Sequence, residues 1–267
     1  MDAGSRMNRT ILLVSTTLAE AQRLAVDGPR RDFLELARSA GAEIQHQSAR
    51  RRNGIAGKLS GPHFGQAWRA AAACHAGDAL FADGEHIGLP LQLFLALRRR
   101  RPGRLVVLGH LLTRPRKLAL LWLATRVGPP GTLVLHSVEQ ERTVRRFVGW
   151  RWRISLAPYQ VDTAYWTPGA GLHGTGALPL VLAVGSENRD YATLVRAVEG
   201  LPVRVIIAAG SHWARETAQA GSARNVEYSG RPLPFAELRE RYREAAVVVV
   251  PVHDVRSEER RVGKECA

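Results

Sequence analysis

The chain has 267 residues, a formal charge of +14 and 45% hydrophobic residues, which excludes collagen-like, disulfide-framework and wholly disordered classes. At roughly 100 to 200 residues per domain, this length allows one large domain or two modest ones, each with a real core. No apolar run approaches the roughly 20 residues of a membrane-spanning helix, so we expect a cytoplasmic protein. Cys74 and Cys266 lack metal-ligating neighbours, so we expect neither a disulfide partner nor a zinc site.

The basic residues are almost all arginines, because only Lys58, Lys117 and Lys264 are lysines. A GC-rich coding sequence tends to produce this skew, which competes with a phosphate-binding face as its explanation. The densest cluster, Arg98 to Arg101, stands where a predicted helix ends, and the helix dipole favours cations there. The arginines are not interleaved with a stacking platform of aromatics, so no nucleic-acid partner is expected.

The last residues require separate treatment. The stretch from Arg256 to Cys266 resembles the translation of a common sequencing-library adapter, residue for residue. The alternative is an ordinary solvated charged tail. We expect residues 256–267 to be an artefact and the biological sequence to stop near Val255, and we exclude them from fold reasoning.

In the first half, short apolar runs alternate with segments of helical spacing. The predicted strands cover 11–14, 79–82, 105–108, 132–135 and 154–156. The predicted helices cover 32–40, 64–75, 89–100 and 116–126, and a capping box of Ser137 and Gln140 predicts a further helix after His136. Residues 48–62, with three glycines, predict a mobile loop.

The alternation restarts after a glycine-rich stretch at 168–176. Strands are predicted over 180–184, 203–208, 226–228 and 247–250, and helices over 190–198, 213–220 and 235–245. Strands that are apolar on both faces and alternate with helices indicate parallel sheets covered on both sides. We therefore predict an α/β protein of two doubly wound, Rossmann-like domains at 1–165 and 179–255, joined by a hinge at 166–178.

Ligands of open parallel sheets bind beyond the carboxyl ends of the strands. Polar residues follow these ends in both predicted domains: Ser15, Thr16, Thr17, Asp83, Glu85, His86, His110, His136, Ser137, Ser186, Glu187, Asn188, Arg189, Ser211, His212, Arg231, His253 and Asp254. Any one of them could be a plain loop residue or helix cap. Their recurrence on one edge of both sheets predicts a shared cleft. Gly-x-Gly-x-x-Gly, Walker A, zincin and Asp-x-Asp motifs are absent, so no cofactor and no metal ion is expected.

Three segments resemble a known family. Residues 154–168, Ile-Ser-Leu-Ala-Pro-Tyr-Gln-Val-Asp-Thr-Ala-Tyr-Trp-Thr-Pro, look like the strand and hinge segment of GT-B retaining glycosyltransferases, the family of glycogen synthase-like and mannosyltransferase enzymes. Residues 180–198 resemble the first strand, turn and helix of that family's second domain. Gly230 with residues 237–251 is similar to a later helix and strand.

The resemblance implies transfer of a sugar from a nucleotide-sugar donor to an unknown acceptor, with retention. Arg189 matches a position where the family usually carries Lys or Arg, and with Gly185 and Ser186 it would bind the donor diphosphate. Ser186 departs from the arginine that the family more often has there. His110 resembles the catalytic first-domain histidine near the transferred sugar. Asp83, Glu85 and His86 would then line the acceptor side.

Two other functions stay open, a nucleotide-sugar epimerase of similar architecture and a two-lobed binding protein without chemistry. In the resembled family, further elements follow the strand that corresponds to 247–250. We therefore expect the second domain to be incomplete and this chain to be inactive and poorly soluble, although its parent gene would encode a transferase.

A membrane surface is a further open alternative. Apolar residues of 89–97 and 118–123, including Phe94 and Trp122, stand next to Arg98 to Arg101, Arg116 and Lys117. This composition suits peripheral docking on the anionic inner face of a membrane. We favour the simpler interpretation that the apolar residues are core and the arginines a solvated rim, because these helices must cover a sheet.

Overall fold

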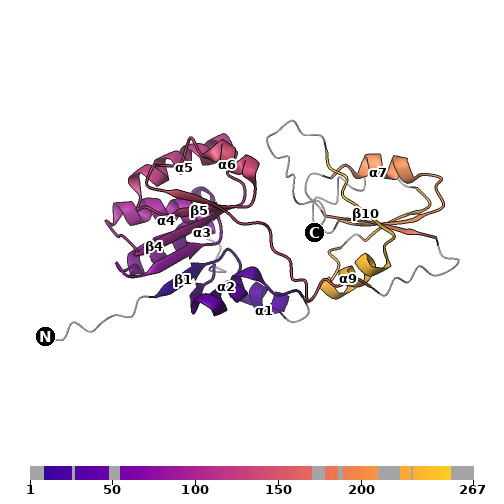
Figure 1. Ribbon diagram of the computed structural model, residues 1–267, viewed down its shortest axis with the longest axis horizontal. Coiled ribbons are helices and arrows are strands. Elements are labelled where there is room, and N and C mark those ends of the chain that lie inside the picture. Colours follow the sequence, from indigo (N-terminus) through magenta and orange to yellow (C-terminus); the bar gives the residue numbers. More distant parts are fainter. Residues whose placement is uncertain are drawn as a thin grey trace. The chain divides into compact units, whose positions relative to one another are not determined.

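The computed structural model describes residues 9–25, 28–47, 55–169, 178–185, 189–209, 223–229 and 231–253. The chain divides into two compact units, and the division along its main course falls between Gln160 and Val161. The predicted boundaries of domains and hinge remain predictions. Figure 1 shows both units and labels their helices and strands where there is room.

The first unit is built on a parallel sheet of six strands in the order β2-β1-β3-β4-β5-β6. Its strands are β1 (Thr10–Leu13), β2 (Glu43–Gln45), β3 (Ala79–Ala82), β4 (Arg104–Gly109), β5 (Thr132–Leu135) and β6 (Arg153–Leu156). Every pairing is parallel. The carboxyl ends of all six strands therefore lie at one edge.

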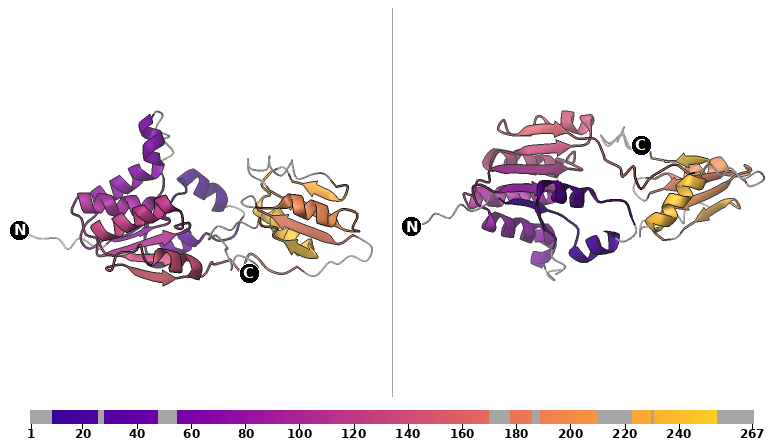
Figure 2. Two further views of the ribbon diagram at one scale, coloured as in Figure 1. Left: turned by 90° about the horizontal axis from the view of Figure 1, so that it is seen from above. Right: turned by 60° about the horizontal axis from the view of Figure 1, so that its bottom comes forward.

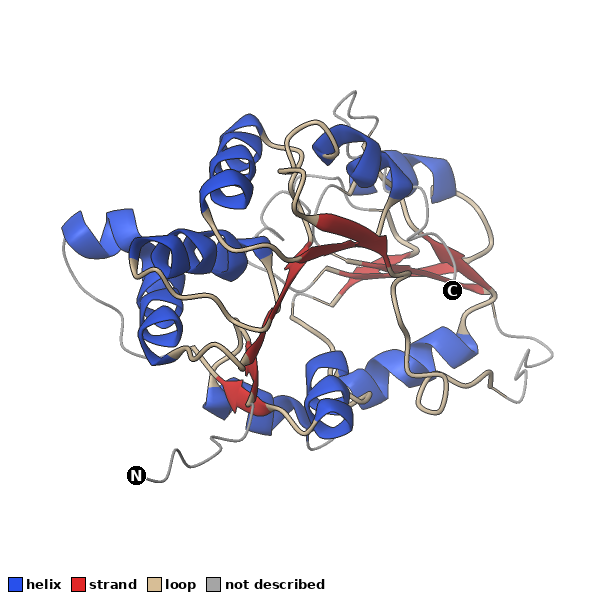
Figure 3. Ribbon diagram, turned by 60° about the vertical axis from the view of Figure 1, so that its left-hand side comes forward, coloured by secondary structure: helices blue, strands red, loops and turns tan. Residues whose placement is uncertain are grey.

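Helices cover both faces of this sheet, as Figures 2 and 3 show. They are α1 (Leu18–Ala25), α2 (Asp32–Ala40), α3 (Ile55–Ala73), α4 (Glu85–Leu97), α5 (Pro115–Val127) and α6 (Val138–Val144). Alternate residues of β1 point to opposite faces: Ile11 and Leu13 join the core under α3 to α6, whereas Leu12 packs with α1 and α2.

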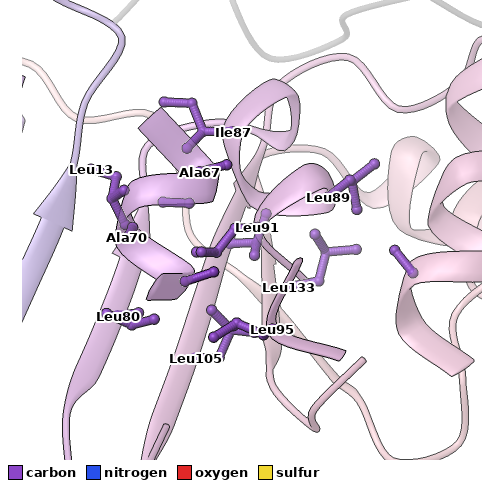
Figure 4. Close-up of a cluster of buried hydrophobic side chains, with 14 of the residues drawn as sticks. Leu13, Ala67, Ala70, Leu80, Ile87, Leu89, Leu91, Leu95, Leu105 and Leu133 are labelled. Atoms are coloured by element: carbon purple, nitrogen blue, oxygen red, sulfur yellow. The ribbon is translucent and has the colours of Figure 1, made fainter. Parts of the chain in front are cut away.

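The larger core lies between the sheet and helices α3 to α6. Leu91 and Leu95 of α4 are fully buried with Leu105 of β4 and Leu133 of β5, as the close-up in Figure 4 shows. The leucines of 89–97 that we considered for a membrane surface are thus largely core, which confirms the simpler interpretation for them. Leu97 and Trp122 are exposed.

The second unit holds a smaller parallel sheet in the order β10-β7-β8-β9. Its strands are β7 (Leu180–Val184), β8 (Arg204–Ala208), β9 (Val226–Tyr228) and β10 (Val247–Val249), with helices α7 (Tyr191–Val198) and α9 (Phe235–Glu244). Alternate residues of β7 again divide between two cores: Val181 packs with α7, and Leu182 packs on the face that Tyr242 of α9 joins. The predicted class, two doubly wound parallel-sheet domains, is confirmed.

One strand differs from the prediction of sheets covered on both faces. Val247 of β10 is 53% exposed and Val248 is 43% exposed, because β10 is the edge strand of the described sheet and pairs only with β7 there. Its run of valines resembles that of a buried strand, although its side chains are accessible.

The segment from Val161 to Gly169 packs against α9. Trp166 meets Tyr242 edge-on at 5.6 Å between ring centroids, and the Arg243 guanidinium donates to the Thr167 hydroxyl at 2.6 Å. Arg239 lies over the ring of Tyr165 at 4.7 Å. Tyr165 and Trp166, which follow the Pro-Tyr-Gln-Val-Asp segment, thus help to hold α9.

Several elements differ from the prediction or lie outside the described residues. Helix α1 and strand β2, which span only eight and three residues, were not predicted. Residues 55–62 belong to α3 rather than to a loop, because each residue added to an existing helix gains a hydrogen bond that offsets the glycines. Helix α4 spans Glu85–Leu97, so it begins four residues before the predicted helix at 89–100 and ends three residues earlier. The predicted helix at 213–220 lies outside the described residues.

Candidate functional site

One aspartate and two histidines, Asp83, His110 and His136, lie close together where β3, β4 and β5 end. The His110 ring lies 5.7 Å from the ring of His136, between centroids, and its Nε2 lies 3.3 Å from the backbone carbonyl of Asp83. A carbonyl can only accept, so this contact places the His110 proton on Nε2. His136 in turn stacks on Tyr159 at 4.1 Å. The His110 ring remains accessible at the sheet edge.

Glu85, the first residue of α4, holds the backbone of His110 in place through a hydrogen bond. Its side chain is 4% exposed; one carboxylate oxygen accepts from Lys117 Nζ at 2.6 Å, and the other accepts from the His110 backbone N–H at 2.9 Å. Burial raises the pKa of Glu85, but these hydrogen bonds outweigh burial and hold the pKa below its usual range. Glu85 is therefore an anion that positions His110.

Asp83 lies half-buried at the end of β3. Burial, with a smaller contribution from the charge of Asp32, raises the pKa of Asp83 to about 7. A carboxyl with this pKa can hold or release a proton near neutral pH, which is a requirement for general acid or base chemistry. This carboxyl and the buried anion of Glu85 are two residues apart and titrate in opposite directions from their usual values.

His86 forms a second imidazole contact at the same edge. Its ring meets His63 of α3 edge-on at 4.3 Å, and burial, assisted by the charge of His63, lowers the pKa of His86 to about 4. The ring folds back over Gly84, where an added Cβ would lie only 2.4 Å from it. Any larger residue at position 84 would displace His86.

Sequence reasoning placed Asp83, Glu85, His86 and His110 at this edge, and the structure brings them together. It missed Lys117 and His63. The sequence pattern placed Lys117 in a surface cluster. In the structure it forms a hydrogen bond with Glu85, 32 residues away in the sequence, and only the fold brings the two together. His63 lay between the predicted loop at 48–62 and the predicted helix at 64–75, and no sequence signal connects it with His86.

The candidate donor residues lie beyond β7 in the second unit. Gly185 has a left-handed φ of +118°, and the Tyr191 hydroxyl donates to its carbonyl at 2.6 Å. The Arg189 guanidinium packs against it, since a Cβ added at Gly185 would lie 3.0 Å from Arg189 Nε and Nη2. Burial raises the pKa of Tyr191 to about 12, which the Arg189 charge partly opposes.

Helix α7 follows Arg189 in the sequence, after the capping residue Asp190. Asp190 caps it by accepting from the Thr193 N–H at 3.0 Å, and the Asp190 backbone N–H donates to the Pro251 carbonyl. An antiparallel bridge joins Arg189 to Val252, next to His253. The backbone around Arg189 is therefore fixed from two sides, which places a cation at the amino end of a helix, where anions bind.

Several predicted site residues lie outside the described residues, namely Ser186, Glu187, Asn188, Ser211, His212 and Asp254. Within the described ranges, no cluster of three or more His, Cys, Asp or Glu is placed to hold a metal ion. Of the helices that the structure describes, none is long and apolar enough to cross a membrane.

No protein-family model matches the sequence, and neither does any curated protein. Two solved structures are similar in fold. The trehalose-6-phosphate synthase of Burkholderia multivorans matches with a TM-score of 0.65 and 14% identity over 92% of this chain and 77% of that one. HepE of Anabaena, solved in complex with UDP and glucose, matches with a TM-score of 0.59 and 13% identity over 92% of this chain and 74% of that one.

These similarities establish the fold. The chain has the two Rossmann-like domains of the GT-B type, of which the second is the smaller. The predicted GT-B architecture is confirmed.

Proposed function

We propose that this protein is a glycosyltransferase that moves a sugar from a nucleotide-sugar donor to an acceptor, with retention as in the family that its motifs resemble. The observation that carries the proposal is Arg189, packed against the left-handed turn at Gly185 and directly before α7. The GT-B fold shared with a protein solved with UDP and glucose supports it. UDP-glucose is therefore the first donor to test.

The donor side needs positive charge because the nucleotide leaves as a diphosphate. A preorganised cation and a helix amino end stabilise that developing charge without a metal ion. Arg189 supplies the cation, and Gly185 lets the chain approach closely where a Cβ would press on the guanidinium. Ser186, the next residue in the sequence, is assigned to the same diphosphate site by the family resemblance.

His110 is the proposed catalytic residue of the first unit. Glu85 fixes its backbone, and the Asp83 carbonyl fixes its ring. Asp83, with a pKa near 7, and His86, which stays neutral at that pH, are assigned to the acceptor side. The buried carboxylate of Glu85 already accepts from two groups, so we assign it to positioning rather than to substrate binding.

The proposal extends to activity and location. We propose that the 267-residue chain binds donor weakly and does not turn over, because the exposed valines of β10 leave the second sheet without cover on that side in the described residues. A cytoplasmic protein in peripheral contact with the inner membrane face is proposed as well.

Incubation with labelled nucleotide sugars tests the proposed function. Both this chain and the product of the resequenced parent gene should be assayed. Transfer with retention by the parent gene product, lost in His110→Ala, is the expected result. Ring isomerisation would instead indicate an epimerase, and saturable binding without turnover by the parent gene product would indicate a binding protein; either result would contradict the proposal.

A further inference from the structure

The edge of the first sheet opposite His110 is rich in arginine. The connections that enter β3, β4, β5 and β6 are residues 74–78, 98–103, 128–131 and 145–152. Together they carry Arg98, Arg99, Arg100, Arg101, Arg145, Arg146 and Arg151. Their one carboxylate, Asp78, is buried and paired with Arg9 at 2.7 Å. We call these four connections the arginine edge.

Exposed apolar side chains lie at the same end of the unit. Leu97, the last residue of α4, is 71% exposed, and Val127, the last residue of α5, is half exposed. Trp150 stands at the turn before β6 and is 91% exposed. An indole this accessible costs hydrophobic free energy in water, so its presence beside arginines points to a surface that becomes covered.

Two further indoles, those of Trp68 and Trp122, indicate which partner covers it. The Arg98 guanidinium lies 3.9 Å over the ring of Trp68, and the Arg126 guanidinium lies 4.8 Å over the ring of Trp122. Cations therefore already occupy ring faces on which nucleic-acid bases would stack. Isolated tryptophan and aliphatic side chains among arginines instead match the headgroup region of an anionic bilayer.

At the end of α4, an arginine occupies a strained backbone conformation. Arg99 has a left-handed φ of 52°, the Arg100 N–H donates to the Leu95 carbonyl, and the Arg99 N–H donates to the Ala96 carbonyl. This is a Schellman helix end, whose left-handed position usually holds glycine. Keeping arginine there strains the backbone, which suggests that the positive charge serves a purpose.

We propose that the arginine edge docks on an anionic lipid bilayer, with Trp150 and Leu97 at the level of the headgroups. The surface shares Leu97 and Arg98 to Arg101 with the one suggested by sequence, but it consists of helix ends and turns rather than helix faces. It is also independent of the proposed sugar transfer, because it lies at the amino ends of the strands and His110 lies at the carboxyl ends.

Co-sedimentation of the full chain with vesicles tests this proposal. The probes are vesicles of phosphatidylcholine alone and of equal parts phosphatidylcholine and phosphatidylglycerol. The test variants are Trp150→Ala and the triple variant Arg99→Gln, Arg100→Gln and Arg101→Gln. The matched control removes three exposed arginines of the second unit, Arg196→Gln, Arg204→Gln and Arg224→Gln, and so has the same net charge.

We expect binding to the anionic vesicles only. At roughly fivefold per arginine, the test triple should weaken it by about 100-fold, whereas the control triple should weaken it far less. Trp150→Ala should weaken binding several-fold at unchanged charge. Arg99→Gly should weaken binding by about fivefold while raising the melting temperature of the first unit, which a purely structural role would not produce.

Three outcomes would overturn the proposal. The wild-type chain fails to bind anionic vesicles, or the two triple variants lose binding equally, or Trp150→Ala binds like wild type. Tighter binding to single-stranded RNA than to the vesicles, lost in the test triple, would assign the edge to nucleic acid instead.

Discussion

Removal of the Lys117 ammonium should expose how Glu85 holds the first unit together. In Lys117→Met the Glu85 carboxylate stays buried, at 4% exposure, but loses its cationic partner and keeps the backbone N–H groups of His110 and of Glu85 itself. Breaking a buried ion pair costs about 3 to 5 kcal/mol. Because the Lys117 side chain is 34% exposed, we expect about 3 kcal/mol at pH 8.

The pH dependence of this loss is the diagnostic feature. In the wild type, the pKa of Glu85 lies below its usual value, so the pair contributes stability that is present above pH 4.5 and is lost as the pH falls through the folded pKa. In Lys117→Met, burial should raise that pKa above 4.5. The variant then becomes less stable as the pH rises from 4.5 to the new pKa, by at most about 1.4 kcal/mol per pH unit.

Urea unfolding of both proteins between pH 4.5 and 8, combined with hydrogen exchange at the amides of β3 to β5, measures the difference. Adding Glu85→Gln to Lys117→Met should remove the part of the pH dependence that Lys117→Met introduces. Arg142→Met, which breaks an exposed pair with Glu139, is the control and should cost less than about 1 kcal/mol. A wild-type to Lys117→Met difference that stays constant over this pH range would refute the reasoning.

Three further predictions follow from single groups. Asp83→Asn should raise the free energy of unfolding at pH 8 by up to roughly 4 kcal/mol and have little effect near pH 4. The reason is that the raised pKa of Asp83 destabilises the wild-type fold as the pH rises from about 4 to 7. Equal effects at both pH values in urea unfolding would contradict this prediction. Gln92 is fully buried in α4 with neither amide atom paired among the described residues, so Gln92→Met should stabilise the protein by about 1 to 3 kcal/mol in thermal unfolding, and a loss of stability would show that the amide has a partner. Gly185→Ala should destabilise the second unit by about 1 to 3 kcal/mol in urea unfolding and weaken UDP binding, because φ is +118° and the Cβ meets Arg189; an unchanged variant would argue against the strained turn.

Period and run length were sufficient to predict most of the regular elements. The strand at 79–82 and the helix at 32–40 match β3 and α2, because each carries a strong apolar pattern between glycine or polar boundaries. The Ser137 cap is also observed, with its side chain accepting from the Gln140 N–H. Weak elements such as β2 owe their strand structure to pairing with β1, which no local pattern encodes.

The sequence predicted which residues gather at the candidate site but not which side chains pair there. Strand order brings the ends of β3, β4 and β5 together, so residues after those strands could be grouped by the rule for parallel sheets. Side-chain partners were not predictable, since the Lys117 to Glu85 pair and the His63 to His86 contact depend on how α5 and α3 pack. The exposed Trp150 and the buried Trp152 differ by two positions, and only the fold distinguishes them.

Calorimetric titration of the full chain with UDP-glucose tests whether Arg189 binds the donor. We predict saturable binding that Arg189→Gln weakens at least tenfold, as expected for loss of a charge-assisted diphosphate contact worth about 1.5 to 3 kcal/mol. Arg196→Gln, which removes an exposed arginine from the far end of α7, should bind like wild type. Binding that is equally tight in Arg189→Gln, or weakened equally by Arg196→Gln, would contradict the assignment of the donor site.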